Sequence, residues 1–205
     1  MTIAIGDKIP ATTFKIMGEK GPQDITSDEI FAGKKVVLFA VPGAFTPGCT
    51  VTHLPGYVVL ADKIKAKGVD SIVCLSVNDA FVMGAWGKSQ NAEELIMLAD
   101  GNGTFTKAVG LELDASGFGM GTRSKRYAMI VDKGVVTHLA VEPVDLHDDG
   151  GVGLAHAVDL EAPREAGFAA AQRGRLRLAA LRPQQPKLGA DRAVAGGRPL
   201  PDEIA

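Results

Sequence analysis

The stretch AVPGAFTPGCT, residues 40–50, places Cys49 directly after a run of small and turn-forming residues. An apolar run precedes it at residues 36–41, and helical spacing of apolar side chains follows it over residues 47–67. Cys49 would then lie in the first turn of a helix, where unpaired N–H groups and the helix dipole favour a thiolate. The alternative is that Cys49 is a small buried apolar residue, the commoner role of a lone cysteine.

A thiolate alone is a modest catalytic device. An ordinary cysteine with a pKa near 8.5 is about 3 % thiolate at pH 7, so complete ionisation gains only about thirtyfold. A cysteine enzyme therefore needs a hydroxyl and a guanidinium directed at the leaving atom. Thr46, three residues before Cys49, offers the hydroxyl. Arg123 and Arg126 are the only arginines among residues 1–142, where lysine is the usual cation, which favours a role for their fork of donors.

Short apolar runs bounded by turn residues predict the strands that must position these groups, and helix-length segments separate the runs. Strands this apolar are covered on both faces, which predicts an α/β layered sheet. A DKG turn at residues 132–134 predicts an antiparallel hairpin, so the sheet should be mixed. The predicted strands are residues 36–41, 71–77, 95–99, 127–131 and 135–141. One predicted helix begins at Thr26, and three others span residues 47–67, 78–87 and 104–110.

Composition narrows the class of protein. The chain has 205 residues and a net charge of −2, which favours neither a nucleic-acid partner nor an acidic membrane surface. No apolar stretch is long enough for a membrane span, and the N-terminus lacks the pattern of a signal peptide. Two cysteines do not make a disulfide framework, so we expect a protein of the reducing cytoplasm. Cys74 lies within an apolar run and is expected to be a buried structural thiol.

The use of basic residues changes near Glu142. Residues 1–142 hold two arginines and twelve lysines, whereas residues 143–205 hold seven arginines and one lysine. We therefore expect a folded domain over residues 1–142, followed by an Ala/Arg/Gly/Pro-rich tail that is largely disordered, with a helix near residues 164–181. A shifted reading frame would explain the change in composition, and an ordinary tail of biased composition would explain it equally well.

Several motifs together resemble those of the peroxiredoxin family. PGAFTPGC at residues 42–49 resembles the P-x-x-x-T-x-x-C motif, in the wording of the type-five (type-two or atypical) subfamily. The resemblance continues in THLPGY, CLSVNDAFVMGAWG, LADGNGTFTKAVGLELD and RSKRYAMIVDKGVV, and it spans essentially residues 1–142. It implies a thioredoxin-like fold, with a mixed sheet flanked by helices, and reduction of hydrogen peroxide and alkyl hydroperoxides.

The resemblance also implies roles for individual residues. Cys49 would be the peroxidatic cysteine that becomes a sulfenic acid, and Thr46 would hydrogen-bond the peroxide. Pro42 would shield the sulfenic acid, and Arg126 rather than Arg123 would bind both sulfur and peroxide. Apart from the resemblance, the spacing alone places His53 one helical turn after the cysteine, where it would pack, face a partner subunit or tune the thiolate.

Gly48 belongs with His53, beside the site or at an interface. No metal or organic cofactor is implied, and relatives of this type commonly form dimers through the face near the active site.

The sequence departs from two-cysteine members of the subfamily because no cysteine follows Cys74. A one-cysteine enzyme needs an external thiol, so we expect glutathione, with or without glutaredoxin, and thioredoxin is the alternative. The family's final acidic loop and helix have no close counterpart after Glu142, so the domain could be incomplete there. Other readings are a disulfide or glutathione-transfer enzyme, and a non-enzymatic holdase or remnant on the same scaffold.

Overall fold

The computed structural model describes residues 1–142, so the tail at residues 143–205 and the helix expected near residues 164–181 lie outside the described residues. The described strands are β1 (Thr13–Gly18), β2 (Gly21–Thr26), β3 (Lys35–Val41), β4 (Ser71–Ser76), β5 (Ile96–Ala99), β6 (Glu112–Asp114), β7 (Thr122–Ser124), β8 (Tyr127–Asp132) and β9 (Val135–Val141). The described helices are α1 (Ser27–Phe31), the π-helical turn η1 (Cys49–His53), α2 (Leu54–Lys65), α3 (Ala80–Ser89), α4 (Thr104–Ala108) and the 3-10 turn η2 (Ser116–Phe118).

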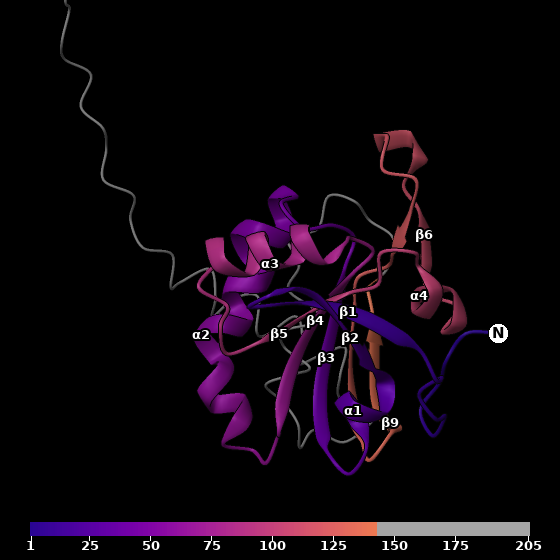
Figure 1. Cartoon of the computed structure of the whole chain (residues 1–205). Coiled ribbons are helices and arrows are strands. Elements are labelled where there is room, and N and C mark those ends of the chain that lie inside the picture. Colours follow the sequence, from indigo (N-terminus) through magenta and orange to yellow (C-terminus); the bar gives the residue numbers. More distant parts are fainter. Residues whose placement is uncertain (143–205) are drawn as a thin grey trace, which may run out of the picture.

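A seven-stranded sheet in the order β2-β1-β5-β4-β3-β8-β9 forms the centre of the domain (Figure 1). Strands β3, β4 and β5 are parallel, whereas β8 and β9 add antiparallel on one side and β1 and β2 on the other. The sheet is therefore mixed, as the alternation of strands, helices and a hairpin turn predicts. A separate two-stranded ribbon of β6 and β7 projects from the body of the domain (Figure 1).

The alternation of side chains along β3 builds a core on each face of the sheet. Val37, Phe39 and Val41 pack with apolar residues of α2 and α3, whereas Val36 and Leu38 pack on the other face with residues of α1 and α4. Because β3 is central and both of its faces are covered, it reads as a continuous apolar run in the sequence. Each large side chain buried in this way contributes roughly 1.5–3 kcal/mol.

The five strands expected from apolar runs are present with ends shifted by at most one residue, and the helix at Thr26 has the predicted capping box. The β1–β2 hairpin and the β6–β7 ribbon were not predicted. Their strands are partly exposed, and β2 reads GPQDIT, whose Gly, Pro and Asp are depleted in strands. Cross-strand pairing, rather than local propensity, produces them.

The helix that carries Cys49 begins at Pro47, as expected, but it is not regular throughout. Over η1 the backbone is π-helical, and the N–H of Leu54 donates to the carbonyl oxygen of Cys49, five residues earlier. The helix then continues as α2 to Lys65, slightly short of the expected end, and Gly68 follows with a φ of 80°. Single π-turns occur in α-helices chiefly near functional residues, and this one starts at Cys49.

Candidate active site

Three chain segments meet at one edge of the sheet because of strand direction. The carboxyl ends of β3 and β4 lie at this edge because the two strands are parallel. Strand β8 runs the other way and pairs Tyr127 with Ala40, so its beginning lies there too. The loop after β3 carries Cys49, the segment after β4 carries Asn78, and Arg126 directly precedes β8. The sheet therefore gathers residues that lie far apart in the sequence.

Cys49 and Arg126 are in direct contact. The Nη1 atom of Arg126 lies 3.6 Å from the Sγ atom of Cys49, as a donor to the sulfur. Both cysteines of the chain are free thiols, and Cys49 is only 1 % exposed. A Cβ atom built on Gly48 would lie 3.7 Å from Nη2 of Arg126, so the glycine backbone lies against the guanidinium. A cation with several N–H donors thus faces the sulfur of Cys49 in the first turn of a helix.

Thr46 and Pro42 belong to the turn that leads into the helix. The hydroxyl of Thr46 donates its proton to the carbonyl oxygen of Gly43 at 2.8 Å, and the N–H of Thr50 donates to the carbonyl oxygen of Thr46 at 2.9 Å. Because the hydroxyl proton is used, Oγ1 of Thr46 can offer only its lone pairs to a ligand. Pro42 is half-buried beside Gly43, where an added Cβ would lie 3.1 Å from Cγ2 of Thr46. The turn is therefore closely packed.

Asn78 and Ser76 hold the cysteine loop to the end of β4, and neither was singled out from the sequence. The N–H of Ala44 donates to Oδ1 of Asn78 at 3.0 Å. The buried hydroxyl of Ser76 lies 2.8 Å from the same Oδ1 and 3.2 Å from the carbonyl oxygen of Val41, and it can donate to one of them at a time. The available signal was positional, because polar residues directly after a buried parallel strand lie at the edge where the cysteine loop begins.

A hydrogen bond from α3 also holds the π-helical turn. The indole Nε1 of Trp86 donates to Oγ1 of Thr50 at 3.1 Å, and Trp86 is completely buried. Thr50 is the residue after Cys49, so this bond fixes the turn that carries the thiol against the next helix.

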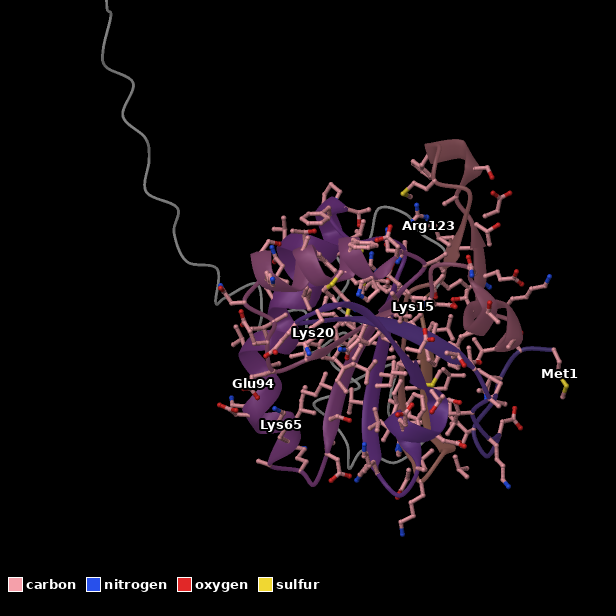
Figure 2. The ribbon with its side chains drawn as sticks, viewed as in Figure 1. Met1, Lys15, Lys20, Lys65, Glu94 and Arg123 are labelled. Carbon is pink, nitrogen blue, oxygen red and sulfur yellow. The ribbon has the colours of Figure 1, made fainter. Side chains whose placement is uncertain are left out.

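Arg123, the other arginine considered from the sequence, has a different set of contacts. Its Nε donates to the carbonyl oxygen of Met120 and its Nη1 to that of Val77, each at 2.9 Å. It lies in β7 of the β6–β7 ribbon (Figure 2), and its bond to Val77 joins that ribbon to the segment after β4. The structure therefore brings Arg126 to the sulfur and directs Arg123 to backbone carbonyls.

His53 is completely buried within its own chain, although a role facing a partner subunit was one of the alternatives. Its ring centroid lies 5.4 Å from that of Phe39 and 5.5 Å from that of Tyr57, edge-on to both. The rings of Phe39 and Tyr57 stack at 3.7 Å. The imidazole is thus part of the core beneath the cysteine turn.

Cys74 is completely buried in β4, as expected. Burial raises the pKa of its thiol well above 9.0, and the nearby Cys49 raises it further. A thiol of this kind stays protonated at neutral pH and is a weak nucleophile. The same burial raises the pKa of the Tyr57 phenol, with smaller contributions from Cys74 and Glu142.

Glu142 contacts the other edge of the arginine and was not identified from the sequence. Its Oε2 lies 2.7 Å from Nε of Arg126, and the two side chains are only 8 % and 13 % exposed. The sequence signal was weak, because one glutamate at the end of a strand looks like an ordinary surface residue.

Two further features concern only residues 1–142. Within that span, no three His, Cys, Asp or Glu side chains come together in an arrangement that could hold a metal ion. None of the helices described there has the length and apolar character needed to cross a membrane.

The family model described as Redoxin matches residues 4–152. A peroxiredoxin of Synechocystis is 46 % identical over an alignment of 146 residues, and the match covers 67 % of this chain and 77 % of that protein. The solved peroxiredoxin 5 of Alvinella pompejana has 38 % identity and a TM-score of 0.66, with 78 % of this chain and 99 % of that chain covered. The chain belongs to the redoxin family and is a peroxiredoxin of the type-five kind.

The thioredoxin-like fold implied by the motifs of this peroxiredoxin is confirmed by its solved relatives. One of them is the reduced Prx3 of Vibrio vulnificus, solved in complex with hydrogen peroxide. It is 60 % identical, has a TM-score of 0.69, and the match covers 72 % of this peroxiredoxin and 92 % of that chain.

Proposed function

We propose that this peroxiredoxin is a thiol-dependent peroxidase that reduces hydrogen peroxide and alkyl hydroperoxides through Cys49. The observation that carries the proposal is the contact of the Arg126 guanidinium, 3.6 Å from the Cys49 sulfur, at the first turn of a helix. The peroxide complex of the Vibrio vulnificus relative supports hydrogen peroxide as a substrate. The chemistry requires a nucleophilic sulfur and a fixed cation, and these residues supply both.

In the proposed reaction the Cys49 thiolate attacks one peroxide oxygen along the O–O bond. The sulfur–oxygen bond forms as the O–O bond breaks, and the electron pair of the O–O bond leaves with the second oxygen. Arg126 donates hydrogen bonds to the oxygens as charge develops on them, and the leaving oxygen takes up a proton to become water or an alcohol. Thr46 accepts a hydrogen bond from the peroxide O–H, since its own proton is directed at Gly43. The product on the enzyme is a Cys49 sulfenic acid.

The burial of Cys49 sets which reactants can reach it. At 1 % exposure, the sulfur is accessible to a small peroxide more readily than to a bulky thiol. We propose that the first helical turn unwinds after oxidation and exposes the sulfenic acid to the reductant. The segment that would unwind includes the π-helical turn Cys49–His53, which carries the thiol. In the closed state, the half-buried Pro42 shields the sulfenic acid from a second peroxide.

The reductant is proposed to be glutathione, with or without glutaredoxin, and thioredoxin is the alternative. No cysteine follows Cys74 in the sequence, and the raised pKa of the buried Cys74 thiol makes it a poor attacking group. One external thiol condenses with the sulfenic acid to a mixed disulfide and water, and a second restores the Cys49 thiol as the external disulfide forms. The electrons pass between sulfur and oxygen, so the proposal includes no metal or organic cofactor.

The proposed setting is a homodimer in the cytoplasm. Phe45, Val51 and Phe81 are 54 %, 76 % and 65 % exposed, and they belong to the cysteine loop, η1 and the start of α3. Exposed apolar side chains on elements that adjoin a site favour an interface there. Light scattering of the purified chain tests the dimer, and cell fractionation tests the location, because some relatives carry the word chloroplastic in their names.

The decisive experiment follows oxidation of the reduced full chain by hydrogen peroxide in a stopped-flow instrument. We expect rapid loss of one thiol in the wild type and none in Cys49→Ser. Steady-state turnover is then compared with glutathione, with glutathione plus glutaredoxin and with thioredoxin, in the wild type and in Cys74→Ser. Turnover of peroxide by Cys49→Ser would exclude the proposed mechanism, and loss of glutathione-linked turnover in Cys74→Ser would exclude the one-cysteine cycle.

A further inference from the structure

The guanidinium of Arg126 is held on two of its edges. Nη1 faces the sulfur of Cys49 at 3.6 Å, and Nε lies 2.7 Å from the Oε2 of Glu142. The side chains of Arg126 and Glu142 are almost completely buried. A guanidinium is planar, so fixing the Nε edge also fixes the direction in which its Nη groups point.

The position of Glu142 is set by backbone pairing. The N–H of Glu142 donates to the carbonyl oxygen of Arg126 at 2.9 Å, which continues the β8–β9 ladder by one residue. The pairing starts from Asp132 opposite Val135 and shifts register between Ile130 and Val131, where a β-bulge adds a residue to β9. Without that extra residue, Val141 rather than Glu142 would face Arg126, and bulges commonly redirect a side chain in this way.

We infer that Glu142 is a positioning residue for peroxide reduction, which holds Arg126 in the orientation that the Cys49 reaction requires. The inference rests on the proposed peroxidase function. The carboxylate opposes the positive charge that faces the sulfur, so its contribution is alignment of the donors rather than a stronger cationic field. A misplacement of about 1 Å in a catalytic group can lower a rate by roughly 100-fold.

Two reactions of the Cys49 thiol distinguish the alignment of Arg126 from a general loss of site structure. Oxidation by hydrogen peroxide needs Arg126 aimed at the peroxide oxygens, whereas alkylation by iodoacetamide needs only an accessible, ionised sulfur. A positioning role predicts that Glu142→Ala slows oxidation about 30-fold and changes alkylation less than about threefold. Equal falls in both rates would indicate a general loss of site structure and would overturn the inference.

Two conservative variants of Glu142 distinguish the length of its side chain from its negative charge. They remain informative if Glu142→Ala does not fold. Glu142→Gln keeps the length of the side chain and an oxygen acceptor for Nε, and we expect at least a third of the wild-type oxidation rate. Glu142→Asp keeps the charge but is one methylene shorter, and we expect it to be about tenfold slower than Glu142→Gln. The reverse order would show that charge, not alignment, is required, and it would overturn the inference.

Two controls complete the experiment. Glu94→Gln removes a carboxylate from the exposed ion pair with Lys65 (Figure 2) and should leave both rates unchanged. In an Arg126→Ala background, Glu142→Ala should change the oxidation rate less than twofold, because no guanidinium remains to be aligned; a further large loss contradicts the inference. If the wild type itself is not oxidised rapidly, the proposed peroxidase function fails. If the wild type is oxidised rapidly and the Glu142 variants are oxidised at the same rate, only the positioning role fails.

Discussion

At the scale of single residues, the two arginines of the domain differ in what their donors reach. Arg126 directs Nη1 at the Cys49 sulfur, whereas Arg123 donates to two backbone carbonyl oxygens. Local sequence does not distinguish them, because both lie in the same short segment before β8. The distinction matters for the chemistry, since a fork of donors stabilises developing charge on two oxygens at once.

The fork can be tested separately from the charge with Arg126→Lys. Lysine keeps a positive charge but presents it as a compact ammonium that cannot span sulfur and peroxide together. We expect the rate of Cys49 oxidation by hydrogen peroxide to fall about 100-fold, within the range for loss of one transition-state donor. Stopped-flow fluorescence of Trp86, the single tryptophan, provides the measurement, with Lys20→Ala on the exposed β1–β2 turn as control. A rate within threefold of the wild type would mean that charge alone suffices.

At the scale of elements, the cysteine loop is fixed by the strand next to the one it follows. Asn78, just after β4, accepts from the N–H of Ala44, and Trp86 of α3 donates to Thr50 of the π-helical turn. Parallel pairing of β3 and β4 places these partners at one edge. The loop therefore presents the thiol in one position, although the sequence separation between Ala44 and Asn78 is 34 residues.

Loss of the hydrogen bond between Asn78 and Ala44 should loosen the cysteine loop, with opposite effects on oxidation and on alkylation of Cys49. Asn78→Ala leaves the N–H of Ala44 without that acceptor, at a stability cost of about 1–3 kcal/mol. We expect oxidation by hydrogen peroxide to slow about tenfold because the site is less well ordered. Alkylation by iodoacetamide should accelerate because the sulfur is more exposed. Asn102→Ala, in an exposed turn, is the matched control, and unchanged rates in Asn78→Ala would refute the anchoring role.

At the scale of the whole molecule, the two cores bury one thiol and two phenol groups that stay protonated in the folded state. Burial raises the pKa of Cys74 well above 9.0 and the pKa values of Tyr57 and Tyr127 well above 10.0. In the unfolded chain these groups ionise near their ordinary values. Folded and unfolded states therefore hold the same protons on these groups at neutral pH and different numbers in alkaline solution.

The free energy of unfolding should consequently fall at high pH. Below about pH 8.5 the Cys74 thiol is protonated in both states, and above it only the unfolded state loses the proton, so stability falls by up to about 1.4 kcal/mol per pH unit. Above about pH 10 the buried tyrosines add to the slope. Urea denaturation from pH 7 to 10.5 in a Cys49→Ser background measures this, and Cys74→Ala should delay the onset to near pH 10. Parallel curves for the two proteins would contradict the assignment to Cys74.

Much of the frame was accessible from local sequence. The central strands are continuous apolar runs, the start of the helix at Pro47 follows from turn chemistry, and Cys49 therefore falls at a strand–helix junction. The type-five peroxiredoxin motifs identified the family and indicated Arg126 as the arginine that contacts the sulfur. The residues alone did not distinguish Arg126 from Arg123. The β1–β2 hairpin was missed because its strands are exposed and weakly patterned.

The partners that complete the site depend on long-range pairing. Asn78 reaches the cysteine loop because β3 and β4 are parallel neighbours, a relation that no local pattern specifies. Glu142 faces Arg126 because of the β-bulge between Ile130 and Val131, whereas an unbroken hairpin would place Val141 there. Sequence by itself thus determined the strand–helix junction that carries Cys49, its helix and the central strands, since these depend on neighbouring residues. Only the tertiary structure decided what surrounds the arginine, because a shift of one residue in register changes which side chain lies opposite it.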